Sequence, residues 1–331
     1  MIPGRPSILE IKGLRTQFFL QEGTVTALDG VDLNIYERES LGIVGETGCG
    51  KSMTAFSILR LVPHPGRITA GTIKFKGIQL ASLTEDQMRT IRGKRISMIF
   101  QDPSTSLDPV FTVGQQLGEV ISLHQNIYEK NALNARILRA LKLVRIAAPE
   151  NVIKQYPHEL SGGMKQRVMI ALALSCSPEL LIADEPTTAL DVTIQAQILN
   201  LIKDLIRTTG ASMMLITHNL GVVAETCDRI CIMYAGRIVE EAETFELFAN
   251  PLHPYTGGLL TAFPKLGERK DELSVIRGSV PNLMQLFKGC PFEDRCDSSM
   301  DICRLSRPAR IEARPGHFVS CHLYATAGGP G

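Results

Sequence analysis

The segment with the most specific chemistry is a glycine-rich octapeptide near residue 50. Gly45-Glu46-Thr47-Gly48-Cys49-Gly50-Lys51-Ser52 fits the pattern G-x-x-x-x-G-K-[S/T] at every fixed position. Glycines let backbone N–H groups turn inward around phosphate oxygens, and a helix that begins here adds its positive N-terminus. In this pattern Lys51 bridges the β- and γ-phosphates of a nucleotide, and Ser52 places its hydroxyl on Mg²⁺. The octapeptide therefore predicts a nucleotide site.

An acidic pair supplies the second half of such a site. Leu180 to Ala183 is an apolar run typical of a buried strand, and Asp184 and Glu185 follow it directly. Ligands collect at the C-terminal ends of parallel strands. We expect Asp184 to hold Mg²⁺ through water and Glu185 to polarise the attacking water as a general base. The alternative, an acidic pair that only ends a strand, is disfavoured by the octapeptide.

Two further positions have both a structural and a functional interpretation. His218 follows an apolar strand, where a single histidine is most often a core residue. This strand is expected to neighbour the strand of Asp184, which favours a γ-phosphate contact instead. Ser161-Gly162-Gly163 begins a helix and offers a second anion site, although an ordinary helix cap would look the same.

The elements that position these residues alternate along the chain. A β-rich N-terminal part leads to a buried strand at 41–44, which runs into the octapeptide and a helix; further strands are expected at 180–183 and 213–216. This alternation predicts an α/β fold with a parallel sheet, interrupted by a helical insert at about 101–178. After about residue 264 the pattern gives way to short segments rich in Pro, Arg and Cys. We therefore expect one domain over 1–263 and a small extension over 264–331.

Charge and hydropathy exclude several classes of protein. The 35 Lys and Arg balance 34 Asp and Glu, so the charge footprint of a nucleic-acid-binding protein is missing. No apolar run approaches the ~18–20 residues of a membrane helix. The first six residues carry no apolar leader, so export is not expected.

Taken in order along the chain, these motifs resemble those of the ATP-binding subunits of ABC transporters. The resemblance covers about residues 8–260, and it implies a P-loop NTPase with a parallel-sheet core, an antiparallel β subdomain and a helical subdomain. Beside the octapeptide and the acidic pair, four further positions match the family: Gln101 resembles its Q-loop, Ser161-Gly162-Gly163 its signature motif, Ala189-Leu190-Asp191 its D-loop and His218 its switch histidine. Phe18, with Phe19 as the alternative, resembles the aromatic residue that stacks on adenine.

The resemblance also implies roles for individual residues. Catalysis would involve Glu185, His218, Gln101 and Lys51. Mg²⁺ would be held by Ser52, Gln101 and Asp184. The residues implied in nucleotide binding are Phe18, Gly45, Glu46, Thr47, Gly48, Cys49, Gly50, Lys51, Ser52, Met53, Gln101, Ser161, Gly162, Gly163, Asp184 and Asp191. In the family the sites form between two subunits arranged head to tail.

Other segments indicate a subtype. Residues 101–109, 156–160 and 250–256 are similar to those of prokaryotic di- and oligopeptide importers. Met164, where the signature usually carries Gln, together with Thr187-Thr188 resembles the first of the two unlike ATPases of these systems. The implied partners are a homologous second ATPase, two membrane permeases and an extracytoplasmic peptide-binding protein, with no nucleic acid. The implied location is peripheral, on the cytoplasmic face of the inner membrane. Importers of nickel or another small solute share much of the pattern and are the alternative.

Four cysteines crowd the extension. Cys290, Cys296, Cys303 and Cys321 match neither the usual zinc spacings nor common ferredoxin runs, so a [4Fe–4S] cluster, zinc and reduced structural thiols all stay open from the residues alone. Their surroundings resemble the C-terminal extension of peptide-importer ATPases, which implies a [4Fe–4S] cluster. His317 and His322 are possible substitute ligands if the metal is zinc.

Cys49 lies inside the octapeptide, where the helix N-terminus is expected to lower the pKa of its thiol. We therefore expect alkylation of this thiol to block ATP hydrolysis and bound ATP to protect; a filler residue at a variable position is the alternative.

Three other classes fit the sequence less well. An ABC-type ATPase of DNA repair or chromosome organisation requires a long heptad insertion or a basic face. A translation-associated ABC protein carries two such octapeptides, and this sequence has one. The third is an iron–sulfur redox or sensor protein with an incidental ATPase.

Overall fold

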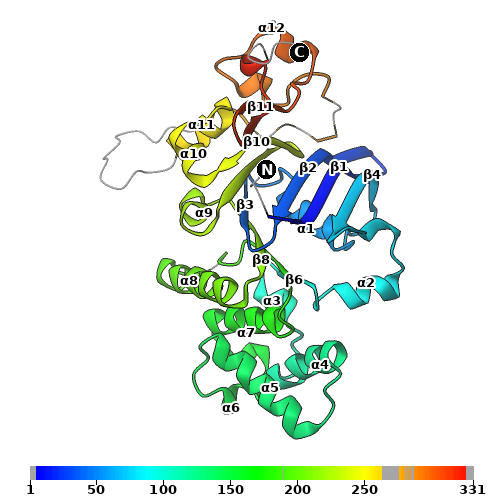
Figure 1. Ribbon diagram of the computed structural model, residues 1–331, viewed down its shortest axis with the longest axis vertical. Coiled ribbons are helices and arrows are strands. Elements are labelled where there is room, and N and C mark those ends of the chain that lie inside the picture. The colour runs from blue at the N-terminus through cyan, green and yellow to red at the C-terminus, as the bar shows by residue number, and fades with distance from the viewer. Residues whose placement is uncertain are drawn as a thin grey trace. The chain divides into compact units, whose positions relative to one another are not determined.

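The computed structural model describes residues 5–188, 190–262, 276–279, 281, 283, 284 and 287–325, with the side chain of residue 192 left out. The chain divides into two compact units (Figure 1). Unit 1 comprises residues 1–36, 40–81 and 216–331, and unit 2 comprises residues 37–39 and 82–215. The expected domain boundary near residue 264 falls outside the described residues.

Unit 1 contains an antiparallel sheet formed by the N-terminal part of the chain. Its strand order is β2-β1-β4-β5, with β1 (Ser7–Leu20), β2 (Gly23–Tyr36), β4 (Gly66–Phe75) and β5 (Ile78–Gln79). Along β1, Leu9, Ile11 and Leu14 are buried, while Lys12 and Arg15 are exposed. This alternation buries one face of the sheet and leaves charged side chains on the other.

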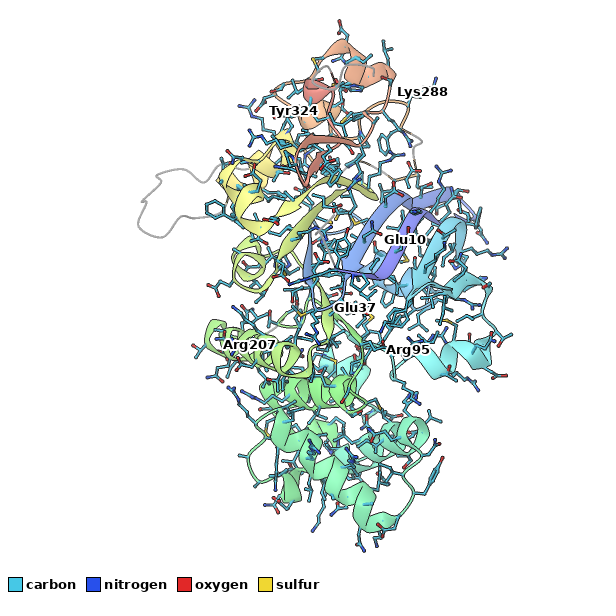
Figure 2. All side chains as sticks on the ribbon, viewed as in Figure 1. Glu10, Glu37, Arg95, Arg207, Lys288 and Tyr324 are labelled. Atoms are coloured by element: carbon cyan, nitrogen blue, oxygen red, sulfur yellow. The ribbon has the colours of Figure 1, made fainter. Side chains whose placement is uncertain are left out.

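A second run of strands in unit 1 combines β3 with four strands from the C-terminal part of the chain. Its order is β11-β12-β10-β9-β3, with β3 (Ser40–Val44), β9 (Arg229–Tyr234), β10 (Arg237–Glu243), β11 (Ile311–Arg314) and β12 (His317–Val319). The pair β3 and β9 is parallel, and the others are antiparallel. The C-terminal extension (residues 264–331) thus adds two strands beside β10. Lys288 and Tyr324 mark its described part in Figure 2.

The helices and short helical turns of unit 1 follow these strands. They are α1 (Lys51–Ile58), α9 (Leu220–Thr226), α10 (Thr244–Ala249), α11 (Pro254–Thr261), η3 (Glu293–Arg295), α12 (Asp301–Leu305) and η4 (His322–Tyr324). A further turn, η1 (Leu80–Ser82), lies where the chain passes into unit 2.

Unit 2 combines short buried strands with helices. Its strand order is β8-β7-β6, with β6 (Ile96–Ile99), β7 (Leu180–Asp184) and β8 (Ser212–Thr217), and β6 pairs with β7 in parallel. The last two residues of β8 already belong to unit 1. The helical elements are α2 (Glu85–Ile91), α3 (Pro103–Ser106), α4 (Val113–Gln125), α5 (Lys130–Leu143), α6 (Pro149–Val152), η2 (Pro157–Glu159), α7 (Gly162–Leu174) and α8 (Val192–Thr209). Helices α4, α5 and α7 pack against one another.

The predicted α/β P-loop architecture is confirmed. The structure has parallel strand pairs, an antiparallel sheet and a helical region within the expected insert. Local signals set several element ends: Thr84 and Thr112 form capping boxes at α2 and α4, and Gly210 ends α8 in the left-handed conformation. No helix in the described ranges is both long and apolar enough to cross a membrane.

Candidate nucleotide-binding site

The octapeptide lies in unit 1 between β3 and α1, as the strand–loop–helix pattern predicts. At Gly45 a Cβ atom would stand 2.2 Å from the Met233 carbonyl oxygen and 2.7 Å from the Cys49 sulfur, so a side chain cannot fit. Gly50 precedes α1 with φ +109°. The loop therefore needs glycine for close packing at one position and for backbone conformation at another.

Lys51 is the first residue of α1 and points back over the loop. Its Nζ donates to the carbonyl oxygens of Gly45 (2.7 Å) and Glu46 (2.9 Å), and the residue is only 5% exposed. The ammonium group is thus placed within the curve of the loop. Ser52 and Met53 follow in the first turn of α1, where backbone N–H groups without helical partners favour an anion.

The expectation for Cys49 is wrong in its premise. The residue is 1% exposed, and burial raises the pKa of its thiol more than the neighbouring Lys51 ammonium lowers it. Its carbonyl accepts from Gly236 N–H at 2.8 Å, which ties the loop to the β9–β10 turn. The side chain packs inward, so the favourable effect of the helix N-terminus does not make it a reactive thiol.

Two other predicted residues also lie in unit 1. Phe18 on β1 is half-buried and pairs with Gly66 of β4, where a Cβ atom would come within 2.7 Å of the Phe18 ring. Its neighbour Phe19 is 47% exposed. His218 is exposed and comes directly after β8, as expected, while Asn219 caps α9. The contact of Phe18 with adenine and that of His218 with the γ-phosphate stay predictions.

In unit 2 the structure brings Gln101 and Glu185 together. The register of β6 and β7 pairs Ile99 with Ala183, and Gln101 and Glu185 each follow two residues later. Gln101 Nε2 donates to Glu185 Oε2 at 3.0 Å, and Thr188 Oγ1 donates to the same oxygen at 2.9 Å. Asp184, at the end of β7, is buried. The sequence reasoning treated Thr188 only as a subtype mark and missed this contact.

Glu185 has an unusual backbone conformation for a side-chain-bearing residue. Its φ of +44° lies in the left-handed region, which is uncommon outside glycine. Behind it, the buried Gln166 of α7 donates from Nε2 to the Pro186 carbonyl oxygen at 2.5 Å. The segment after β7 is therefore held by α7, a link that the sequence reasoning also missed.

The Ser161 and Asp191 motifs lie side by side within unit 2. A Cβ atom on Gly163 would stand 3.3 Å from a methyl group of Ile194, at the start of α8. Ser161 caps α7 by accepting from Met164 N–H at 3.4 Å, and Asp191 caps α8 by accepting from Ile194 N–H at 2.9 Å. The predicted helix start after Ser161 is confirmed. Ala189 of the same motif lies outside the described residues.

The four cysteines of the extension influence one another electrostatically. The pKa of Cys290 is raised to about 11 by burial and by the nearness of the Cys303, Cys321 and Cys296 thiols. Cys290 N–H also donates to the Cys303 carbonyl oxygen at 2.7 Å. Yet nowhere among the described residues do three or more His, Cys, Asp or Glu side chains form a group that could hold a metal ion.

The two histidines considered as substitute ligands have other partners. His317 Nε2 lies 2.7 Å from Glu240 Oε1, and both side chains are buried. His322 Nε2 lies 2.9 Å from the Ser306 carbonyl oxygen. Each ring thus has one nitrogen in a hydrogen bond with a group outside the cysteines. Histidines that bind a metal commonly hydrogen-bond a carboxylate or a carbonyl oxygen through their second ring nitrogen, so the role of His317 and His322 as substitute zinc ligands stays a prediction.

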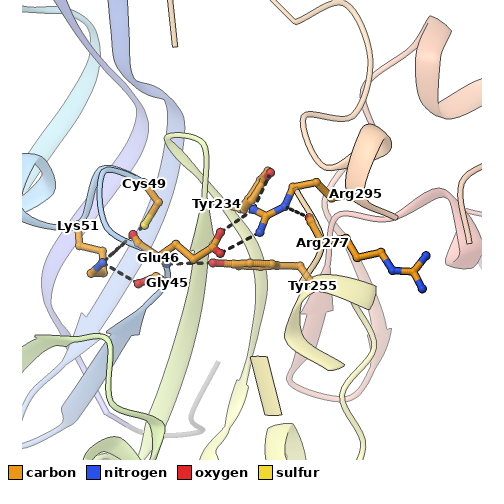
Figure 3. A network of polar contacts seen from close by, with 8 residues as sticks. All are labelled: Gly45, Glu46, Cys49, Lys51, Tyr234, Tyr255, Arg277 and Arg295. Carbon is orange, nitrogen blue, oxygen red and sulfur yellow. Dashed lines mark hydrogen bonds and ion pairs between the residues drawn. The ribbon is translucent and has the colours of Figure 1, made fainter. Parts of the chain in front are cut away.

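Two residues that the sequence reasoning did not assign to the site contact the octapeptide. Tyr255 of α11 accepts from Glu46 N–H at 2.9 Å, and Arg295 of η3 pairs with the Glu46 carboxylate (Figure 3). Burial raises the pKa of the Tyr255 hydroxyl well above its usual range. No sequence signal connects either residue with the loop, because both lie more than 200 positions away.

Comparison with known proteins gives consistent matches. A family model described as "ABC transporter" matches residues 28–188, and one described as "Oligopeptide/dipeptide transporter, C-terminal region" matches residues 239–303. The chain is 52% identical over 321 residues to "Probable peptide ABC transporter ATP-binding protein y4tR" of Sinorhizobium fredii, covering 96% of each chain. It is 49% identical over 323 residues to the oligopeptide transport ATP-binding protein AppD of Bacillus subtilis, covering 97% of this chain and 98% of that protein.

A solved structure extends the likeness to the fold. The ATP-binding cassette MJ0796, a dimer bound to ADP and phosphate after hydrolysis, is 29% identical and matches with a TM-score of 0.64. The match covers 71% of this chain and 98% of that chain.

Proposed function

This chain belongs to the family of ABC transporter ATP-binding proteins, and from that premise we propose that it is the ATP-hydrolysing subunit of an importer for di- or oligopeptides. The observation that carries the ATPase assignment is the loop between β3 and α1, which holds Lys51 within a curve of backbone at a helix N-terminus. The peptide assignment is supported by relatives of nearly equal length whose names specify peptide transport.

In this proposal each part of the loop has a defined task. The N–H groups at the start of α1 bind phosphate oxygens, and Lys51 exchanges its carbonyl partners for the β- and γ-phosphates. Ser52, Gln101 and Asp184 would hold Mg²⁺, which would neutralise charge that develops on the phosphates. Phe18 stacks on adenine, as in the family that the chain resembles. The remaining loop residues position the backbone.

Glu185 is the proposed general base. Its carboxylate accepts hydrogen bonds from Gln101 and Thr188 on one oxygen, which fixes the orientation of the group. The carboxylate then takes the proton from the attacking water. His218 is proposed to contact the γ-phosphate, and the Ser161 motif is proposed to act on ATP bound by a second subunit, with Asp191 beside it.

The proposed assembly follows from the same family. It contains this chain, a homologous second ATPase, two membrane permeases and an extracytoplasmic peptide-binding protein. The chain lies peripherally on the cytoplasmic face of the membrane. Specificity for the solute then resides mainly in the binding protein and the permeases.

We also propose that the four cysteines of the extension bind a [4Fe–4S] cluster, with zinc as the alternative. Four thiolates are a suitable donor set for either, and the mutual electrostatic influence of the cysteines supports the grouping. The thiols do not stand in ligand positions in the described residues, so binding requires them to draw closer together. A bound metal centre would cross-link a small segment with little core of its own.

ATP chemistry is tested with two variants of the full chain. Lys51→Ala should abolish nucleotide binding, whereas Glu185→Gln should bind ATP but lose at least ~10²-fold in hydrolysis within the assembled transporter. Glutamine keeps the shape of the side chain and removes the proton acceptor. The exposed Glu119→Gln on α4 serves as a control that retains activity. Unchanged turnover of Glu185→Gln would refute its role as base.

Substrate class is tested in liposomes that contain the chain with its second ATPase and permeases. Binding protein loaded with a mixture of di- and oligopeptides should stimulate hydrolysis and drive peptide uptake. Stimulation by nickel-loaded binding protein alone would replace the peptide assignment and leave the ATPase assignment intact.

Metal content is tested on protein purified without oxygen. About four irons and four sulfides per chain would support the cluster. Stoichiometric zinc would replace it, and the absence of both would contradict metal binding.

A further inference from the structure

The phosphate-binding loop is held from outside by an arginine of the C-terminal extension (Figure 3). Arg295 Nη1 and Nη2 donate to Glu46 Oε2 and Oε1 at 2.6 and 2.9 Å, which makes a two-bond pair. The Arg295 side chain is 5% exposed and that of Glu46 is 28% exposed. Such bidentate, charge-assisted pairs are the strong and directional ones, and shielding from water strengthens them further.

Arg295 is itself fixed on several sides. Its Nε donates to the Arg277 carbonyl oxygen at 2.8 Å, and its Nη1 donates to the Tyr234 hydroxyl at 3.3 Å. The guanidinium carbon lies 5.8 Å from the centre of the Tyr234 ring and 5.9 Å from that of Phe292. The Glu46 carboxylate, together with the Tyr234 hydroxyl, holds the pKa of Arg295 above its usual range although burial opposes the shift. The guanidinium is therefore a rigid, permanently charged anchor.

Glu46 is the residue where three parts of the molecule meet. Its side chain is held by Arg295, its N–H donates to Tyr255 Oη at 2.9 Å, and its carbonyl accepts from Lys51 at 2.9 Å. The side chain and the backbone of one loop residue are thus both fixed by groups outside the loop. The placement of the Glu46 carbonyl in turn sets the position of the Lys51 ammonium.

We propose that Arg295 is a positioning residue for ATP binding, through which the C-terminal extension completes the nucleotide site. The inference rests on the proposed function and adds a residue to it that the octapeptide pattern does not contain. By holding Glu46, Arg295 keeps the loop in its binding conformation before ATP arrives. Without Arg295, part of the loop becomes ordered only when ATP binds, and the free-energy cost of this ordering lowers the affinity for ATP.

The expected effect is on affinity more than on turnover. Arg295 contacts no reacting group, and once ATP fills the loop the phosphates themselves order it. Arg295→Ala should therefore weaken the binding of Mg-ATP about tenfold, which corresponds to the ordering of about one backbone residue. KM for ATP should rise by a similar factor, while kcat changes less than about threefold.

The test compares five variants of the full chain by titration with Mg-ATP and by melting temperature. Arg295→Ala removes the pair, Arg295→Lys keeps the charge but not the two-bond geometry, and Glu46→Gln weakens the pair from the other side. The fourth combines Arg295→Ala with Glu46→Gln. Arg304→Ala is the matched control, because Arg304 lies in the same extension, pairs with Glu293 at 2.8 Å and is 71% exposed.

The proposal expects weakened binding in Arg295→Ala, partial recovery in Arg295→Lys, and wild-type binding in Arg304→Ala. The combined variant should bind no more weakly than the weaker single variant, because Arg295 acts through Glu46. A lowered melting temperature with Kd within about twofold of wild type would indicate a purely structural role and overturn the proposal. If Arg295→Ala does not fold, wild-type binding of Mg-ATP by both Arg295→Lys and Glu46→Gln would also overturn the proposal.

Failure of this inference is distinguishable from failure of the proposed function. Wild-type protein that binds Mg-ATP, together with Lys51→Ala that does not, supports the ATP site whatever Arg295 does. Wild-type protein that binds no Mg-ATP overturns both. Iron, sulfide and zinc are measured in each variant, so that a change in metal content is not mistaken for loss of the Arg295 pair.

Discussion

Glu240 is a buried carboxylate on β10 that accepts hydrogen bonds from two other segments of unit 1. Leu252 N–H donates to Oε1 at 2.7 Å, His253 N–H donates to Oε2 at 2.8 Å, and His317 Nε2 lies 2.7 Å from Oε1. These contacts fix the residues before α11 and attach β12 of the extension. We expect Glu240→Gln to destabilise the protein strongly while leaving the size of the side chain unchanged.

The magnitude follows from the three donors. Glutamine offers one acceptor oxygen, so at least one buried N–H must face an amide NH₂ group, which costs about 1–3 kcal/mol of stability. The remaining two hydrogen bonds no longer have a charged acceptor, which costs about 1 kcal/mol for each of them. The free energy of unfolding should therefore fall by about 3–5 kcal/mol, and the melting temperature by at least about 6 °C.

The assay is thermal unfolding followed by circular dichroism, since the chain contains no tryptophan for fluorescence. Glu243→Gln at the exposed end of the same strand is the control and should melt like wild type. A fall of less than about 1 kcal/mol for Glu240→Gln would refute the reasoning, because it would mean that water or other groups accept from the three donors once the carboxylate is gone.

Two further predictions follow from burial. Cys49 should resist alkylation by N-ethylmaleimide at pH 7 in the folded chain and react on unfolding, because its thiol is buried and its pKa is raised; rapid labelling in the folded state, read by mass spectrometry, would contradict this. Burial lowers the pKa of His253 from 6.5 to about 4, although Glu240 opposes the shift. The unfolded chain therefore binds a proton at His253 more readily than the folded chain does, and stability falls as pH drops from about 6.5 toward 4. Melting temperatures between pH 7.5 and 5 should decline less steeply in His253→Asn, which keeps a helix-capping acceptor, and equal slopes would count against the assignment.

Much of the fold could be predicted from local patterns. The buried strands before Gly45 and before Glu185 are apolar runs, and the helix starts at Lys51 and after Ser161 follow from residues within one turn. These signals work because strand burial and helix capping depend on neighbours a few positions apart.

The same patterns failed where burial decided the chemistry. Cys49 has the position of an activated thiol at a helix N-terminus, but its side chain packs inward, and desolvation outweighs the nearby positive charge. This outcome cannot be obtained without knowing which groups surround a side chain.

The sequence by itself determined the chemistry of the octapeptide, because eight consecutive residues carry the glycines, the lysine and the hydroxyl that a phosphate site needs. Only the tertiary structure decided what holds that loop in place. Arg295 stands 249 positions after Glu46. Nothing in the sequence distinguishes it, among 35 Lys and Arg residues, as the partner of Glu46. The pairing exists because the C-terminal extension joins the same sheet as the loop's own strand, and a shielded charge there requires an opposite charge as its partner.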